Sequence, residues 1–149
     1  MSYEACQDAL IDVIRKVDGY NKNNAVIGDY RILQKGQTNN IVVHPGPFTR
    51  GRTTFQGGKE NRWEVIIELF VKYRDDAQVQ NGIRDERQLI IDKVDQYPEL
   101  DNESGVFNAE ITSGDEPEPV FGGDGSGPHF FMQRMICEIR EDITVTEQG

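Results

Sequence analysis

The sequence predicts an α+β fold, with a mostly antiparallel central β-sheet, two α-helices packed on one face, and long hairpin or loop arms. Apolar residues recur at spacings of three and four in two segments, as they do on one side of a helix. Two further segments, 63–74 and 130–141, alternate between the two faces of a strand. Two stretches rich in glycine and proline separate these segments, and such residues favour turns.

Length and charge limit the possible classes of protein. The 149 residues are expected to form one domain over 1–149. The formal net charge of −10 makes the chain a poor candidate for gripping nucleic acid, because that affinity comes from Lys and Arg. Residues 1–74 hold 11 basic and 8 acidic side chains, whereas residues 75–149 hold 5 and 18. This asymmetry permits one copy to bind the next through opposite charges, although ordinary solubility charge is the simpler interpretation.

The two cysteines and the N-terminus indicate an intracellular site of synthesis. Cys6 and Cys137 lie far apart, so a buried free thiol at each position is expected, with a long-range disulfide as the alternative. The first four residues do not resemble a signal peptide. No apolar run approaches the ~20 residues that a membrane span needs.

The N-terminal segment 3–18 is predicted to be an amphipathic helix. Ser2 can cap its start, acidic residues follow in the first turns, and Gly19 can close it. A polar stretch over 20–24 is expected to be a loop. The apolar stripe consists of Cys6, Ala9, Leu10, Val13, Ile14 and Val17.

A long, flexible and basic hairpin arm is predicted over 45–61, after two short strands at 30–35 and 40–44. Its glycines and prolines disfavour a regular element. Basic and aromatic residues interleave in the arm, as in proteins that bind single-stranded nucleic acid, but packing on a neighbouring subunit suits this acidic chain better. The candidate interface residues here are Phe48, Arg50, Arg52 and Phe55.

The strand at 63–74 is predicted to be central in the sheet. One face is fully apolar, and the other is mixed, with Ile66 and Phe70 partly covered. Asp75 is expected to cap a second helix that begins properly only near Asn81, because Gly82 weakens its start. Pro98 should end that helix.

The C-terminal third is predicted to contain a strand at 106–112, an acidic loop at 113–129 and the last long strand. Both long strands, 63–74 and 130–141, are candidates for strand addition to a neighbouring copy. The acidic loop supplies three more candidate interface residues, Asp115, Glu116 and Glu118.

Motifs for catalysis or metal binding do not emerge from the sequence. His44 and His129 lack zinc-site spacing and are expected in loops. The acidic loop lacks the alternating ligands of a calcium site. The 123–128 segment resembles the nucleophile motif of chymotrypsin-like proteases, but a glycine separates its Asp from its Ser, so the motif is not matched. We therefore expect no catalytic, cofactor-binding or metal site, no cofactor, and no enzyme activity.

The order of elements resembles the tail terminator (tail completion) proteins of long-tailed bacteriophages. The resemblance covers nearly the whole chain and lies in its pattern and length. It is carried by the N-terminal helix, the long hairpin, the Trp-led strand 63–73, the helical segment 87–94, and then Tyr97, Pro98 and Leu100 before a final strand over 132–139.

The resemblance implies a structural virion protein that forms a ring, a homo-hexamer, at the end of the tail tube. Its partners would be other copies of itself, the tail tube protein and the head–neck connector or stopper. DNA would pass through the lumen without sequence-specific binding. It would be assembled in the host cytoplasm and reside in the virion tail or neck. Another head–tail joining protein (stopper or adaptor) or a tube subunit is the first alternative. A small α+β ligand-binding module or enzyme, and a nucleic-acid binder, are the others.

Overall fold

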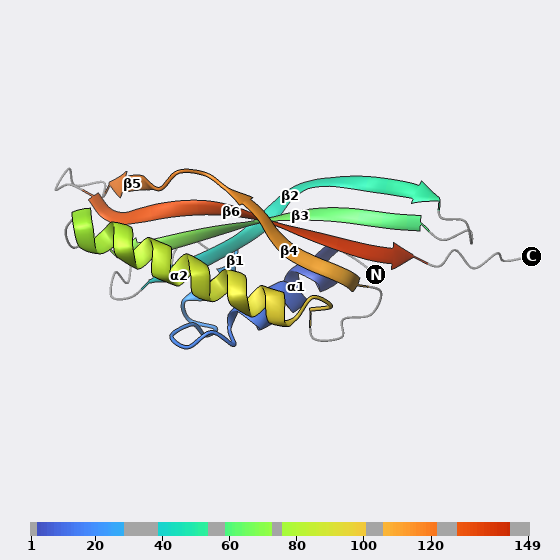
Figure 1. Ribbon diagram of the computed structural model, residues 1–149, viewed down its shortest axis with the longest axis horizontal. Helices are drawn as coiled ribbons and strands as arrows, with labels where there is room; N and C mark the ends of the chain where they lie inside the picture. The colour runs from blue at the N-terminus through green and yellow to red at the C-terminus, as the bar shows by residue number, and fades with distance from the viewer. Residues whose placement is uncertain are drawn as a thin grey trace, which may run out of the picture.

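A computed structural model describes residues 3–28, 39–53, 59–72, 76–100, 106–121 and 128–143 (Figure 1). It confirms the predicted α+β class and the mostly antiparallel sheet. The elements are, in order, α1 (Tyr3–Ile14), β1 (Ala25–Ile27), β2 (Asn40–Thr53), β3 (Lys59–Lys72), α2 (Asp76–Gln96), β4 (Val106–Gly114), β5 (Glu118–Phe121) and β6 (Pro128–Ile143).

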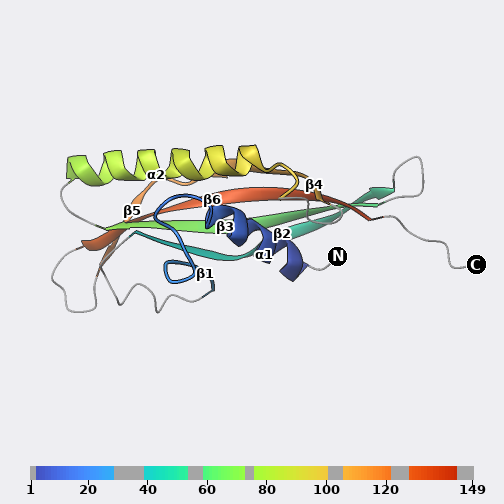
Figure 2. The same ribbon diagram turned by 90° about the horizontal axis from the view of Figure 1, so that it is seen from below.

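Two long β-hairpins lie side by side and form most of the sheet. The strand order is β1-β2-β3-β6-β4, and β5 also pairs with β6. Because β4 and β5 pair with successive parts of β6, they form one interrupted edge strand antiparallel to it. The β2–β3 hairpin and the β5–β6 hairpin run toward opposite ends of an elongated molecule. The strands of the β2–β3 hairpin extend beyond both helices (Figures 1 and 2).

The two longest strands are in the interior of the sheet. β3 pairs with β6 from Lys59↔Ile143 to Lys72↔Phe130, and β3 also pairs with β2 on its other side. This confirms the central position predicted for 63–74. It also corrects the expectation that 63–74 and 130–141 add to a neighbouring copy, because strand addition needs an open edge.

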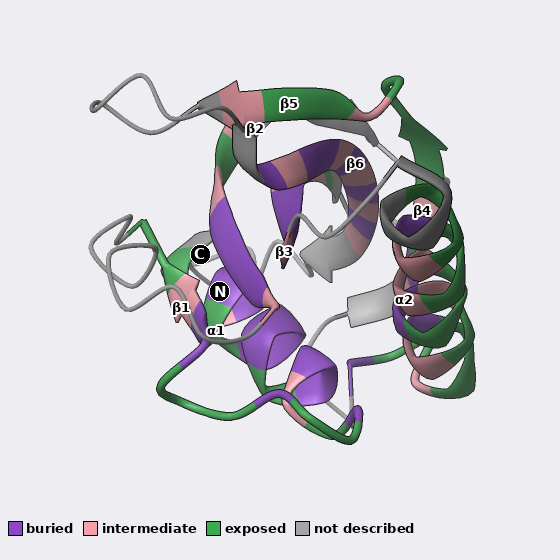
Figure 3. Cartoon of the chain, turned by 90° about the vertical axis from the view of Figure 1, so that its left-hand side faces the viewer, coloured by how far each residue is buried: buried purple, intermediate pink, exposed green. Residues whose placement is uncertain are grey.

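Both helices pack on one face of the sheet, as predicted. The odd-numbered residues of β3 and β6 face α1 and α2 in a single core. Figure 3 shows the sheet curving over the two helices. The side chains that lie at the centre of this core include Leu10, Ile14, Ile67, Leu69, Ile90 and Ile139, and all of them are inaccessible to solvent. Burial of this kind contributes ~1.5–3 kcal/mol for each large aliphatic side chain.

A smaller apolar cluster lies on the opposite face of the sheet. Val42, Phe70, Phe130 and Met132 are buried there. The rings of Phe70 and Phe130 meet edge to face, with centroids 6.3 Å apart. The partial cover predicted for Phe70 is therefore confirmed, and the helix-free face is apolar at this end.

The segment after α1 is bonded tightly to the sheet. The helix ends at Ile14, four residues before the predicted end, and turns lead to Gly19, whose φ of 95° suits glycine. The guanidinium of Arg15 donates two hydrogen bonds to the carbonyl of Ala25, at 3.0 and 2.9 Å. The predicted loop at 20–24 thus leads into β1, a short strand parallel to β2 that sequence analysis missed. The strand expected at 30–35 lies outside the described residues.

Residues 45–53 and 59–61 belong to β2 and β3, so the hairpin predicted over 45–61 is confirmed, whereas the expectation that its glycines and prolines prevent long strands was wrong. β2 stays paired with β3 despite its prolines and glycines, because the pairing shifts register twice, between Pro45 and Phe48 and between Arg50 and Thr53. Such bulges accommodate an extra residue while the ladder continues. Gly46 is needed in the first bulge, since a Cβ there would lie 2.8 Å from the carbonyl oxygen of Glu64.

The acidic loop predicted at 113–129 contains strand residues at both ends and in its middle. Residues 113–114 belong to β4, 118–121 to β5 and 128–129 to β6, so both histidines lie on strands rather than in loops. Only 115–117 interrupt the edge, and 122–127 lie outside the described residues.

The second helix begins at Asp76 rather than near Asn81. Gly82 allows a close approach there, because its missing Cβ would lie 3.3 Å from Cγ1 of Val71.

Candidate functional site: the helix-free face and the two sheet edges

The predicted interface residues lie on opposite edges of one sheet. Phe48, Arg50 and Arg52 belong to β2, near one edge, and Arg50 pairs in register with Asn61 of β3. Asp115, Glu116 and Glu118 lie on the β4–β5 edge and are exposed. The fold therefore does not bring the two groups together within one chain. Phe55 lies outside the described residues. We call 48–53 the basic edge and 110–118 the acidic edge.

The interruption at Asp115 is held firmly against β6. The backbone N–H of Asp115 donates to the carbonyl of Arg134 at 2.8 Å, and its carbonyl accepts from the Gln133 amide at 2.9 Å. Gln133 is 4 % exposed, and its oxygen accepts a hydrogen bond from Arg87 of α2 at 3.4 Å. The acidic edge thus presents its carboxylates from a fixed backbone.

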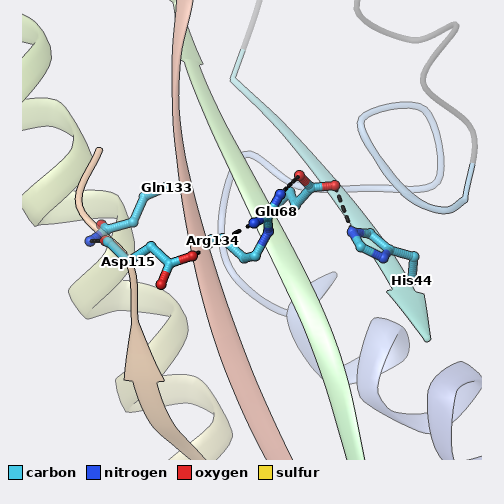
Figure 4. Close-up of polar contacts among 5 residues, drawn as sticks. All are labelled: His44, Glu68, Asp115, Gln133 and Arg134. Atoms are coloured by element: carbon cyan, nitrogen blue, oxygen red, sulfur yellow. Dashed lines mark hydrogen bonds and ion pairs between the residues drawn. The ribbon is translucent and has the colours of Figure 1, made fainter. Parts of the chain in front are cut away.

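A ladder of polar side chains crosses the helix-free face from β2 through β3 and β6 to the break between β4 and β5 (Figure 4). His44 of β2 contacts Glu68 of β3, with Nε2 and Oε1 2.7 Å apart. The other carboxylate oxygen of Glu68 lies 3.4 Å from the Arg134 guanidinium of β6, which lies 3.6 Å from the Asp115 carboxylate. We call these four residues the polar ladder.

Burial makes Glu68 the centre of the polar ladder. The residue is 4 % exposed, and a buried carboxylate is costly unless it is paired. Arg134 supplies the permanent positive charge, and His44 Nε2 supplies a short hydrogen bond. The side chain of Asp115 at the far end is 68 % exposed. The ladder therefore ties the register of β2, β3 and β6 to the acidic edge.

A second charged group lies further along the same face. Glu138 of β6 accepts from the Arg140 guanidinium at 2.8 Å and lies 3.5 Å from that of Arg62. In register, Glu138 stands between Glu64 of β3 and Glu110 of β4. Three carboxylates in adjacent strands oppose one another, an arrangement that costs stability unless cations are near. Arg62 and Arg140 provide them.

The ionisable side chains beneath this face reflect its burial. Burial, followed by the charges of Glu110 and Glu138, raises the pKa of the Cys137 thiol to about 12. Cys6 and Cys137 are both free and buried, which confirms the expected pair of separate thiols. Burial, followed by a 2.7 Å hydrogen bond to Glu86, also raises the pKa of Tyr20.

Sequence analysis missed the polar ladder because its members come from four separate segments. The alternation of β3 and β6 already placed Glu68 and Arg134 opposite the apolar face. The signal that was available is the spacing of charged residues four positions apart within each strand, at Glu64 and Glu68 and at Arg134 and Glu138, which places each pair on one face. Register, which pairs Glu68 with Arg134, is visible only in the folded sheet.

Within the described residues, no group of three or more His, Cys, Asp or Glu side chains is placed to hold a metal ion. None of their helices is long and apolar enough to cross a membrane.

Comparisons with known proteins show similarity to solved structures but to no family model. No protein-family model matches the chain. No curated protein matches it either. A solved structure described as the PVC sheath/tube terminator of an extracellular contractile injection system, in its extended state, is similar with a TM-score of 0.47 and 10 % sequence identity. The similarity covers 99 % of this chain and 58 % of that protein, so the chain spans little more than half the length of the protein it matches.

Proposed function

We propose that this protein is a structural subunit of the tail terminator type, which assembles into a ring at the end of a tail tube. The observation that carries the proposal is the position of the basic and acidic edges on opposite sides of one sheet. A closed ring uses heterologous contacts, in which one surface of a copy meets a different surface of the next. Opposite edges with opposite charges are suited to such a contact.

The mechanism is assembly rather than catalysis. In this proposal the rigid two-hairpin sheet holds the contact surfaces, and α1 and α2 support it from one face. The ring, a hexamer by the resemblance stated above, would cap the tube and join it to the head–neck connector or stopper. DNA would pass through its lumen without sequence-specific binding, since an acidic wall repels phosphates and lets them slide. The protein would then reside in the virion tail or neck.

Two kinds of contact are combined in the proposal. The interface between copies would use Arg50 and Arg52 of one subunit and Asp115, Glu116 and Glu118 of the next, with Phe48 and Phe55 as apolar contacts. The helix-free face, crossed by the polar ladder, remains available in each copy for the tube or the connector. A stopper, adaptor or tube subunit would share the contact between copies but would occupy a different place in the particle.

Electron microscopy of the protein mixed with purified tail tubes tests this function. We expect closed rings at one end of each tube and a stable length distribution of tubes after addition. Light scattering on the free protein reports whether rings form before docking. Density distributed along the tube wall would contradict a terminator and indicate a tube subunit, and a protein that neither self-associates nor binds tubes would contradict the whole proposal.

A further inference from the structure

β4 is the edge strand at the far side of the described sheet from β1. All of its register partners lie on β6, and no described strand pairs with its other side. Along this edge, Glu110 and residues 112–116 are exposed. An edge strand leaves backbone N–H and C=O groups without a ladder partner. The β4 edge is therefore a template on which another extended segment can pair.

The bonds around Gly114 show which backbone groups point away from β6. Gly114 pairs in register with Met135. The next N–H along the chain, that of Asp115, donates to the carbonyl of Arg134 at 2.8 Å. In an antiparallel ladder, a pair flanked in this way directs its own N–H and C=O groups outward. Gly114, which is exposed, therefore presents both groups at the open edge.

The two faces of this edge differ in chemistry. On the helix-free face, the edge carries the carboxylates of Glu110 and Asp115. On the opposite face, Ile111 is half-buried and packs against the main core, and Gly114 presents no side chain. No Lys or Arg occurs between positions 106 and 121. A strand added here would have acidic neighbours on one face and apolar surface on the other.

Cross-strand neighbours determine what the added segment must carry. Opposite charges on adjacent strands stabilise the pairing, and like charges destabilise it. The segment should therefore place Lys or Arg beside Glu110 and Asp115, and apolar side chains beside Ile111 and Gly114. β4 has one extra residue at the register shift between Ile111 and Ser113. A segment that keeps the spacing of β6 thus needs five residues in the order basic, apolar, any, apolar, basic.

Other copies of this chain do not supply such a segment. Two β4 edges would place acidic side chains opposite acidic ones. The basic edge carries its arginines at positions 50 and 52, but the residues that alternate with them are Thr49, Gly51 and Thr53, none of which is apolar. The occupant that fits is consequently a segment of a different protein.

We propose that the β4 edge over 110–115 is a docking site for an extended segment of a partner protein, which adds as a strand and carries the order basic, apolar, any, apolar, basic. Backbone hydrogen bonds supply affinity, and the alternating side chains supply specificity. Pro117 lacks an N–H and ends the ladder on that side. This site goes beyond the proposed function, which gives the edge only charged contacts with the next copy.

Titration with a short peptide tests the proposal. The probe is acetyl-Lys-Val-Thr-Val-Lys-amide, whose sequence reads the same in both directions and so presupposes neither a parallel nor an antiparallel ladder. Acetyl-Glu-Val-Thr-Val-Glu-amide is the control peptide. Amide chemical shifts in NMR spectra should change along β4 and the adjoining part of β6. The Glu peptide should bind at least about tenfold more weakly, because two favourable pairs become unfavourable.

Hydrogen exchange on the unmodified protein reports the backbone contact directly. The outward N–H of Gly114 should exchange without protection in the free protein and become protected about tenfold or more when the Lys peptide is bound, as expected of an amide that joins a ladder.

Removal of charge gives a matched pair of variants. Glu110→Gln/Asp115→Asn should weaken binding of the Lys peptide by about tenfold, because both charge pairs are lost. Asp92→Asn/Asp95→Asn removes the same number of exposed acids from α2 and should leave the dissociation constant within about twofold of its original value.

The outcomes that would overturn the site are distinct from those that would overturn the proposed function. No binding of the Lys peptide, shifts confined to another surface, or a Gly114 amide that stays unprotected would each refute strand addition. Equal binding of the two peptides would refute the charge rule. Dissociation of existing oligomers by the Lys peptide would show that another copy occupies the edge, and would refute a partner protein. None of these measurements requires tail tubes or rings.

Discussion

Glu68 shows how much a single buried charge contributes to this fold. Its carboxylate links His44 on one side to Arg134 on the other, and Arg134 continues to Asp115 (Figure 4). His44 and Arg134 come from different strands, and Asp115 lies in the break between β4 and β5. The residue therefore stabilises the sheet across its width on the face that no helix covers in the described structure.

Replacing Glu68 with Gln is expected to lower the free energy of unfolding by about 1–3 kcal/mol, because the guanidinium of Arg134 loses its buried counter-charge. Chemical denaturation measures the change. Glu118→Gln, an exposed carboxylate on the same face, is the matched control and should change stability by less than about 0.5 kcal/mol. Equal changes in the free energy of unfolding for the two substitutions would show that the contacts of Glu68 in the polar ladder do not stabilise the fold.

Tyr20 joins the segment after α1 to α2 through its hydroxyl, which donates to Glu86. The pKa of Tyr20 is raised in the folded protein, so the folded state keeps the phenolic proton after the unfolded chain begins to release it near pH 10. The stabilisation is therefore fully present below about pH 10 and is lost at higher pH. Tyr20→Phe should cost ~0.5–1.5 kcal/mol at pH 7.

The pH dependence of that cost distinguishes a buried, hydrogen-bonded hydroxyl from an exposed one. The stability difference between the unmodified protein and Tyr20→Phe should shrink as the pH rises from about 9 to 11, as the unfolded tyrosine ionises. Urea unfolding at a series of pH values measures it. A difference that stays constant over this range would contradict the raised pKa.

At the scale of elements, long bulged strands form where composition predicted a flexible hairpin arm and an acidic loop. β2 keeps its ladder through glycines and prolines because its two bulges absorb extra residues. The first bulge brings Gly46 within touching distance of β3. Elsewhere in the fold, Gly82 has a similar role, since it lets α2 approach Val71. Glycine here permits close packing rather than flexibility.

Gly46→Ala tests the first bulge. The added Cβ would lie 2.8 Å from a backbone carbonyl oxygen of β3, and backbone cannot move aside as a flexible side chain can. We expect a loss of ~1–3 kcal/mol in the free energy of unfolding, measured by chemical denaturation. Ser113→Ala, at an exposed position of β4, should be close to neutral. An unchanged stability in Gly46→Ala would mean that the bulge is open at this point.

For the whole molecule, the essential feature is that one rigid sheet separates the basic edge from the acidic edge. Neither edge can neutralise the other within a chain. Charge on the two edges should therefore affect association between copies far more than the stability of one copy, because exposed ion pairs contribute little to folding.

A charge exchange tests this separation. Arg50→Glu/Arg52→Glu should abolish ring formation on tail tubes while leaving the melting temperature within a few degrees of its original value. Adding Asp115→Lys/Glu116→Lys in the same chain should restore rings, since the edges are again complementary. Electron microscopy and sedimentation measure assembly. Asp92→Lys/Asp95→Lys on the exposed surface of α2 is the control, and an equal loss of rings there would contradict an edge-specific contact.

The sequence by itself determined the class of fold, the two helices, the central strand 63–74 and the buried cysteines. These features follow from local periodicity, which reports which side of an element avoids water. It also identified the charged residues of both edges as interface candidates, and that assignment stays a prediction. It misjudged 45–61 and 113–129, because glycine and proline disfavour isolated strands but not strands that bulges and neighbours hold in place.

Only the tertiary structure decided which segments lie side by side. It placed β6 between β3 and β4, paired Glu68 with Arg134, and put β1 against part of β2. Register depends on contacts between residues far apart in the chain, and each is specified by the packing of whole faces rather than by any local pattern. The polar ladder and the opposition of the two edges are consequences of that packing.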